Sequence, residues 1–258
     1  MREITSVQNA LVKKIAELKL KKFRQETGTF FLEGKRAVEE AVHADWEIEK
    51  VFFTVPYKKV WTQLGGDGLD SYQVTEAVMA KMSSTENPQG IGAVVKIKQQ
   101  PALTDFSWKQ GLVLVLDGVR DPGNVGTIIR TADAAGAKAV ILLSETAELF
   151  NPKVVRSTMG SLFHLPVFTD VTKDELLNWC KAKQLPLWVT CLEGSENLFK
   201  VSWPERTVLV MGSEAQGANP ELIAKADKKV RLPMEGKAES LNVAVAAGIC
   251  FFAGPSFR

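Results

Sequence analysis

The sequence predicts an α/β protein in which a smaller α/β domain precedes a domain built on a parallel sheet. The chain has 258 residues, which suits one large domain or two smaller ones at about 150 residues each. Short helix and strand patterns alternate over residues 1–100, whereas longer uninterrupted apolar runs follow over residues 111–258. Residues 101–110 contain Pro101 and polar side chains, so we expect them to form a linker between the two domains.

The first domain begins with a basic segment. Leu11, Ile15 and Leu18 recur at helical spacing, which predicts a single basic helix that continues to Arg24. Short runs of β-branched and aromatic residues, each ended by glycine, proline or polar residues, then alternate with helical patterns. The strands are expected at 29–32, 51–55, 72–74 and 91–97, and the helices at 35–43 and 75–82.

The second domain shows the pattern of repeated βαβ units. Continuous apolar runs are typical of strands that are covered on both faces, as in a parallel sheet. Helical patterns separate these runs, as an α/β fold requires. The strands are expected at 112–116, 139–143, 187–191 and 207–211, and the helices at 125–135, 152–159, 173–183 and 241–252.

Composition and missing motifs exclude several classes of protein. Hydrophobic residues make up 45% of the chain and charged residues 24%, which is ordinary for a globular protein. No apolar run approaches the ~18–20 residues of a membrane span, and the first 22 residues lack the apolar core of a secretory signal. The three cysteines form no CxxC pair, which favours a reducing cytoplasm. The absence of GxGxxG, GxxxxGK[ST] and metal-ligand spacings disfavours dinucleotide, P-loop and metal sites.

Polar residues follow the first apolar strand of the second domain, where ligands of open α/β sheets bind. In the segment after residues 112–116, Pro122, Gly123 and Gly126 allow a tight backbone beside a ligand. Asn124 is expected to cap the next helix, and Arg130 is expected on that helix's surface. From local sequence alone, Arg130 could equally be a rim residue with a surface carboxylate partner.

Two further strand ends carry similar polar groups. Gly212 and Gly217 bracket Glu214 after the strand at 207–211, a pattern that suits either a pocket-lining loop or a plain helix start. Before the last helix, Ser240 is the expected N-cap and Asn242 is expected in the first turn. An asparagine between apolar neighbours is either a satisfied cap or a site group.

Taken together, these segments resemble one family, the SpoU/TrmH-type RNA ribose 2′-O-methyltransferases of the SPOUT superfamily. The resemblance covers about residues 111–253, and Ala215 departs from the glycine that many members have after the glutamate. More weakly, residues 1–97 resemble a ribosomal-protein-like RNA-binding domain. The motifs that carry the resemblance are DPGNVGTIIRTADAAGA, Gly212-Ser-Glu214 with Gly217, Leu232-Pro-Met with Ser240-Leu-Asn242, and GTFFLEGKR at 28–36.

The resemblance implies a fold and a cofactor. Members form a deep trefoil knot, although folded chains are rarely knotted. They bind S-adenosylmethionine in a bent form among the knotted loops, and they are usually homodimers whose active site can borrow residues across the interface. By similarity, the cofactor-binding residues are Gly212, Leu232, Leu241, Gly217 and Thr190.

The resemblance also implies the reaction, a methyl transfer to a ribose 2′-hydroxyl. A neutral arginine acting as base near pH 7 would cost about 7 kcal/mol, so we favour Arg130 as a phosphate clamp and stabiliser of the developing alkoxide. Ribosomal RNA is favoured over transfer RNA as the substrate, because the first domain resembles ribosomal RNA binders. By similarity, the catalytic residues are Arg130, Asn124, Glu214, Ser240 and Asn242.

Clustered cations in the first domain indicate where RNA docks, since such clusters bind phosphates without reading sequence. A solvated lysine face is the other interpretation of the same residues. The expected RNA-binding residues are Lys13, Lys14, Lys19, Lys21, Lys22, Arg24 and Arg36. Two rival functions are a non-catalytic RNA-binding or ribosome-assembly protein and a knotted enzyme that methylates a base. Cofactor binding tests the first rival, and mapping of the modified nucleotide tests the second.

Overall fold

The computed structural model describes residues 2–64 and 68–254 and divides into two compact units. The first unit comprises residues 1–99 and 150–163, and the second comprises residues 100–149 and 164–258. Residues 150–163 were expected in the second domain, whereas in the structure they pack with the first unit. The chain order alone therefore does not define the two units.

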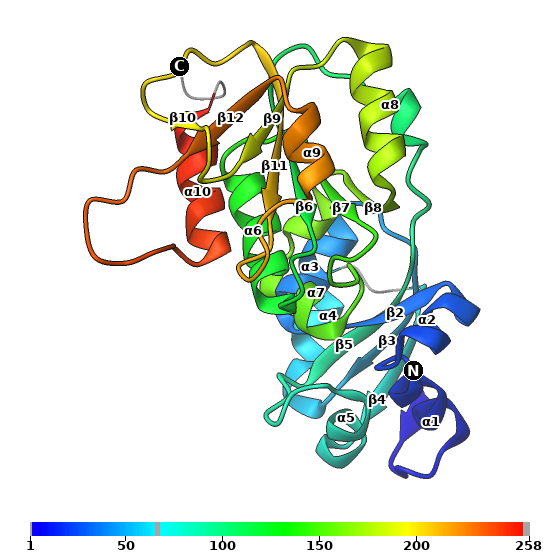
Figure 1. The fold of residues 1–258 in the computed structure, drawn as a ribbon. Helices are drawn as coiled ribbons and strands as arrows, with labels where there is room; N and C mark the ends of the chain where they lie inside the picture. Colours follow the sequence, from blue (N-terminus) through cyan, green and yellow to red (C-terminus); the bar gives the residue numbers. More distant parts are fainter. Residues whose placement is uncertain (1, 65–67, 255–258) are drawn as a thin grey trace. The chain divides into compact units, whose positions relative to one another are not determined.

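The first unit is built on a five-stranded mixed sheet with the strand order β1-β4-β3-β5-β2 (Figure 1). Its core joins the inward side chains of this sheet to apolar residues of the first and fifth helices. The elements are β1 (Arg2–Ile4), α1 (Ala10–Glu17), α2 (Lys21–Thr27), β2 (Thr29–Glu33), α3 (Lys35–His43), β3 (Ile48–Phe53), α4 (Lys58–Gln63), β4 (Asp70–Val74), α5 (Glu76–Met82), β5 (Ile91–Lys96) and α7 (Pro152–Thr158).

The basic segment forms two helices, α1 and α2, instead of the single predicted helix. Arg24 is the reason that the break is stable, because its Nη1 donates a 2.7 Å hydrogen bond to the carbonyl of Leu18 beside the end of α1. The Arg24 side chain is only 2% exposed. The prediction that Arg24 belongs to an exposed RNA-binding surface is therefore wrong, whereas the lysines of this segment are exposed.

Residues 150–163 join the first unit through aromatic and polar contacts. The ring of Phe150 lies 4.9 Å from that of Phe30, and Phe163 packs edge-on against Trp46. Arg156 of α7 donates a hydrogen bond to Ser84. These contacts bury aromatic surface of the first unit's sheet, which explains why α7 packs there.

The second unit contains a parallel sheet, as predicted, but with seven strands where four were expected, in the order β10-β12-β9-β11-β6-β7-β8. Strand β6 is buried along nearly its whole length, which matches its uninterrupted apolar sequence. The elements are β6 (Gly111–Asp117), α6 (Pro122–Ala134), β7 (Ala139–Leu143), β8 (Val167–Val171), α8 (Lys173–Lys183), β9 (Leu187–Thr190), β10 (Glu196–Asn197), β11 (Arg206–Gly212), α9 (Pro220–Lys225), β12 (Lys228–Arg231) and α10 (Val243–Ala253).

Helices cover both faces of this sheet, α8 and α9 on one face and the neighbouring pair α6 and α10 on the other (Figure 1). The segment expected as a linker is part of the packing, because Phe106 and Trp108 stack at 5.6 Å and lie against Trp179 of α8. No helix of the described residues is long and apolar enough to cross a bilayer. The trefoil knot that the resemblance implies stays a prediction.

Candidate active site

The carboxyl ends of adjacent parallel strands bring the predicted motifs to one edge of the second unit's sheet. Strand β11 lies between β6 and β9, and β12 lies on the far side of β9. In the register, Gly212 stands opposite Asp117, and Thr190 stands opposite Val230. The loops that carry the polar motifs therefore start side by side, as the rule for ligand sites in open α/β sheets requires.

Three predicted catalytic residues form a hydrogen-bonded chain at this edge. Asn124 of α6 donates from Nδ2 to the Glu214 carboxylate at 2.5 Å. Asn242, which precedes α10, donates from Nδ2 to Oδ1 of Asn124 at 3.0 Å. The structure thus joins residues that are 90 and 118 positions apart in the chain.

This chain of hydrogen bonds has a fixed direction. The Glu214 carboxylate can only accept, so Asn124 must turn its amide nitrogen toward it. At the other end, Oδ1 of Asn242 accepts from the backbone nitrogens of Ala244 and Val245, so its nitrogen must point outward to Asn124. Both ends require the same orientation of Asn124, which makes the arrangement rigid.

The helix caps differ from the prediction in two places. Helix α6 starts two residues before Asn124, because Pro122 fits the first helical turn and Asp121 caps it by accepting from the Asn124 backbone nitrogen. Helix α10 is capped by Asn242 and not by Ser240. The Asn124 side chain is therefore not needed as a cap and can bind Glu214 and Asn242. Asn242 does both, because its Oδ1 caps α10 and its Nδ2 donates to Asn124.

Two other predicted catalytic residues lie apart from Asn124, Glu214 and Asn242. Arg130 is exposed on α6, and its side chain makes no hydrogen bond or ion pair with any described residue. Its position six residues after Asn124 corresponds to about 9 Å along a helix axis, on a different face. Ser240 is exposed in the segment before α10, and no partner for it exists among the described residues.

Gly212 and Gly217 close a tight hairpin around Glu214. The backbone groups of Ser213 and Gly217 exchange two hydrogen bonds, of 3.2 and 2.9 Å, and Gly217 has a φ of +68° that favours glycine. A side chain at Gly212 would overlap the backbone of Gly217 and Ala218. Only glycine therefore fits at position 212, because the backbone of the following loop passes directly beside it.

The remaining predicted cofactor residues surround the edge of β9, β11 and β12. Thr190 ends β9 and donates to the carbonyl of Val210, and Leu232 directly follows β12. Leu241 is 36% exposed, while Leu192 and Met234 of the same loops are 75% and 37% exposed. Exposed apolar side chains beside backbone groups fit an adenine ring and its polar edge. The residues present are therefore compatible with S-adenosylmethionine.

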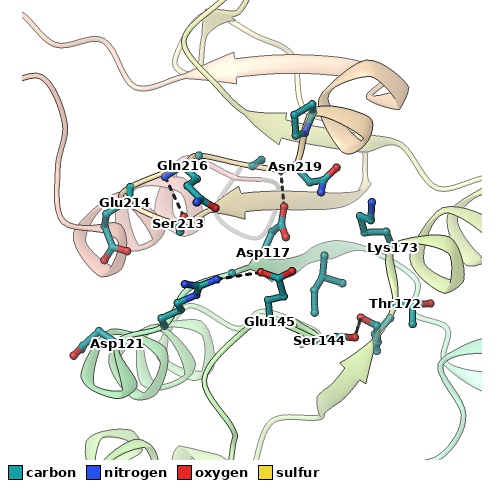
Figure 2. Close-up of a pocket in the computed structure, with 18 residues that line it drawn as sticks. Asp117, Asp121, Ser144, Glu145, Thr172, Lys173, Ser213, Glu214, Gln216 and Asn219 are labelled. Carbon is teal, nitrogen blue, oxygen red and sulfur yellow. Dashed lines mark hydrogen bonds and ion pairs between the residues drawn. The ribbon is translucent and has the colours of Figure 1, made fainter.

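Sequence reasoning missed a polar cavity next to this edge (Figure 2). Asp117 ends β6 and accepts from the Asn219 backbone nitrogen at 2.6 Å, which ties the β11 loop to β6. Lys173 donates to Glu221 at 3.0 Å, and that contact raises the pKa of Lys173. The only sequence signal for this cavity was the polar residue that follows each of several buried strands.

The comparisons with known proteins agree with this geometry. Residues 111–252 match the SpoU rRNA Methylase family. The chain belongs to this family. Residues 9–93 match the MRM3-like substrate binding domain, in the part of the chain where the sequence predicts RNA binding. The SpoU resemblance inferred from three short motifs is therefore confirmed.

Relatives of known name match most of the chain. It is 36% identical over 98% of its length to the 23S rRNA (guanosine(2553)-2′-O)-methyltransferase RlmP of Bacillus subtilis strain 168, and covers 98% of that protein. It is 30% identical to the 23S rRNA (uridine(2479)-2′-O)-methyltransferase of Streptomyces viridochromogenes, over 87% of this chain and 81% of the relative. The crystal structure of an AdoMet-bound rRNA methyltransferase from Sinorhizobium meliloti superposes with a TM-score of 0.89 at 36% identity, covering 98% of this chain and 96% of that one.

Proposed function

We propose that this protein transfers a methyl group from S-adenosylmethionine to a ribose 2′-hydroxyl of ribosomal RNA. The observation that carries the proposal is the directed hydrogen-bonded chain of Asn124, Glu214 and Asn242 beside the edge of β9, β11 and β12. The named relatives support it, since both methylate a ribose of 23S rRNA by name. With ribosomal RNA as the substrate, we expect the reaction to take place in the cytoplasm.

The reaction needs accurate positioning more than a strong base. When bound, the cofactor supplies an electrophilic methyl carbon for the 2′-oxygen. Glu214 and Asn124 orient the ribose through hydrogen bonds, and a rigid orientation lowers the barrier because alignment is established before reaction. Asn242 holds Asn124 in the required orientation. Ser240, two residues before Asn242, is exposed, and we expect it to contact the ribose or its phosphate when RNA is bound.

Arg130 supplies positive charge to the reacting oxygen. An arginine side chain carries positive charge in five N–H donors, so Arg130 stabilises the developing alkoxide or binds the neighbouring phosphate. Because Arg130 lies away from Asn124 on the same helix, a second copy of the chain delivers it. The active site is in this view assembled from both subunits of a homodimer.

An open apolar groove between α6 and α10 is the surface on which the second copy docks. Val245 and Phe252 are 53% and 54% exposed there, which is unusual for side chains of their size. Asn124 and Asn242 line the same groove, so a subunit seated on it lies beside the site. A two-fold arrangement of α6 and α10 presents each subunit's Arg130 to its partner.

Mixing inactive variants tests this shared site. Arg130→Ala and Asn124→Ala each abolish methyl transfer, but a heterodimer of the two has one site with both residues intact. Random reassembly therefore restores about a quarter of wild-type activity. No restoration would show that Arg130 acts within its own chain, and Phe252→Glu should yield an inactive monomer in light scattering.

RNA docks on the basic surface of the first unit, formed by the exposed cations Lys13, Lys14, Lys19, Lys21, Lys22 and Arg36. Each neutralised phosphate steepens the salt dependence of binding. Charge reversal of Lys21 and Lys22 should flatten the slope of log affinity against log salt by about 2. The same reversal of Lys58 and Lys59, which start α4, is the matched control.

The direct test of the function is tritiated methyl transfer from S-adenosylmethionine to undermodified total RNA. Label in alkali-resistant dinucleotides of the ribosomal fraction confirms ribose methylation of ribosomal RNA. Label in a base would contradict it. If the protein neither binds S-adenosylmethionine nor transfers a methyl group, a non-catalytic RNA-binding protein is favoured. Arg130→Ala should abolish turnover but keep cofactor affinity, and wild-type turnover in this variant would refute its role.

A further inference from the structure

A cavity of about 560 Å³ lies beyond the carboxyl ends of β6, β7, β8 and β11 (Figure 2). From β6 the chain continues to β7 and β8 on one side and then returns to β9 and β11 on the other. The strand order thus reverses between β6 and β11. Ligands of open α/β sheets bind at such a switch point, and the volume lies within the ~300–1,000 Å³ of small-molecule sites.

The cavity is separate from most of the expected cofactor contacts. Gly217 lines it and Gly212 ends β11 next to it, but Thr190 ends β9 and Leu232 follows β12, on the other side of β11, and Leu241 precedes α10 without lining the cavity. The loop that follows β11 runs between the two regions. The switch point is therefore available for the substrate.

The polar lining of the cavity is rich in acceptors. Its carboxylates come from four residues and its cations from two, namely Asp117, Asp121, Glu145 and Glu214, and Arg120 and Lys173. Most of these groups already have partners in the protein. Asp117 and Asp121 accept backbone N–H groups, Glu214 accepts from Asn124, and Lys173 donates to Glu221.

Arg120 and Glu145 are the pair that a ligand can engage. They form an ion pair of 3.2 Å from the loops after β6 and β7, and their side chains are 73% and 75% exposed. An exposed pair of this kind contributes about 0–1 kcal/mol to stability. Replacing it with contacts to a ligand therefore costs little.

We propose that this cavity receives the base of the target nucleotide and that Arg120 and Glu145 recognise it as guanine. Guanine presents more N–H donors on its Watson–Crick edge than any other RNA base, which suits a lining rich in carboxylates. The Glu145 carboxylate accepts from N1–H and N2–H, and the Arg120 guanidinium donates to O6 and N7. Enzymes that modify nucleotides commonly recognise an extruded base by hydrogen bonds to its Watson–Crick edge.

Glu214 connects the cavity to the reaction. Glu214 is one of the residues that line the cavity, and its carboxylate accepts from Asn124, so a base held in the cavity leaves its ribose next to the residues that orient the 2′-hydroxyl. Leu143 and Val171, at the ends of β7 and β8, provide an apolar floor for the ring. This inference rests on the proposed ribose methylation and adds the identity of the base.

The test compares Glu145→Gln with Glu205→Gln, an exposed glutamate beside the opposite end of β11. Saturation-transfer NMR measures guanosine and uridine binding to protein that is saturated with S-adenosylhomocysteine. A carboxylate pairing of this kind discriminates by about 10- to 100-fold. We expect Glu145→Gln to lose guanosine binding and kcat/KM for ribosomal RNA by that factor, with unchanged S-adenosylmethionine affinity, while Glu205→Gln stays within about twofold.

Digestion of the methylated RNA to nucleosides separates the two proposals. 2′-O-Methylguanosine as the product, lost in Glu145→Gln, supports the assignment of the cavity. Another 2′-O-methylnucleoside with unchanged kinetics in Glu145→Gln leaves ribose methylation standing and overturns the assignment. Weaker S-adenosylmethionine binding in Glu145→Gln also overturns it, because the cavity would then hold the cofactor. If no methyl is transferred, the proposed ribose methylation is wrong. Guanosine binding still tests the cavity in that case, because equal binding by Glu145→Gln and Glu205→Gln overturns the cavity assignment as well.

Discussion

Asn242 has two contacts that a pair of substitutions separates. Its Oδ1 caps α10 through Ala244 and Val245, and its Nδ2 orients Asn124. Asn242→Asp keeps an acceptor for the cap but places a carboxylate oxygen opposite Oδ1 of Asn124. Asn242→Ala removes both contacts. The first variant should therefore fold normally and react slowly, and the second should be impaired in both respects.

The magnitudes follow from the two contacts. Loss of an asparagine cap costs about 0.5–2 kcal/mol, whereas aspartate is as good a cap as asparagine. For a chain of this size, that cost lowers Tm by about 1–8 °C in Asn242→Ala and leaves Asn242→Asp near wild type. In Asn242→Asp, Asn124 must face an acceptor on one side, because Glu214 occupies the other. An unsatisfied polar group costs about 1–3 kcal/mol. If that cost raises the activation barrier, methyl transfer slows about 5- to 150-fold.

The assay combines thermal unfolding with single-turnover methyl transfer at saturating cofactor. Asn151→Asp is the matched control, because Asn151 caps α7 in the same way and has no contact with Asn124. The reasoning is refuted if Asn242→Asp reacts at the wild-type rate, since the direction of the hydrogen-bonded chain would then be irrelevant. A Tm in Asn242→Asp as low as that of Asn242→Ala would refute the separation of the two contacts.

Two more predictions concern the packing of the second unit. Gly212→Ala should destabilise the protein by about 1–3 kcal/mol and weaken S-adenosylmethionine binding, because the added methyl group meets the loop backbone. Thermal melting and cofactor titration measure the two effects. Gly236→Ala is the control and should change neither, because the space around Gly236 is open. Burial raises the pKa of Cys180 and Cys250 to about 12, so both stay protonated and inaccessible at pH 8. An aromatic disulfide reagent should titrate only Cys191 in the native protein and all three thiols in denaturant, and early reaction of a second thiol would contradict the packing.

The sequence predicted the central strands well because burial on both faces leaves a clear pattern. Strands β6, β7, β9 and β11 are uninterrupted apolar runs, and their predicted bounds agree with the structure within one residue at each end. Strand β12 escaped prediction because Lys228–Arg231 is mostly charged, as suits a strand near the sheet edge.

The sequence predicted three polar residues near strand ends but not the geometry that joins them. Motif spacing placed Asn124, Glu214 and Asn242 at strand ends, yet their mutual hydrogen bonds depend on long-range folding that no local pattern encodes. Arg24 shows the opposite failure. A basic cluster predicts exposure, but this guanidinium satisfies a carbonyl inside a turn between two helices. Its neighbours along the sequence gave no sign of that turn.

The packing of residues 150–163 with the first unit has a consequence for biosynthesis. The chain passes between the units at residues 99/100, 149/150 and 163/164, so neither unit is a continuous stretch. Domains usually fold in order as they leave the ribosome. Here Phe150 and α7 emerge only after β6, α6 and β7, so the first sheet waits for part of the second unit before Phe30 gains its full covering. Nascent chains stalled before residue 150 should bind chaperones longer than those stalled after residue 163.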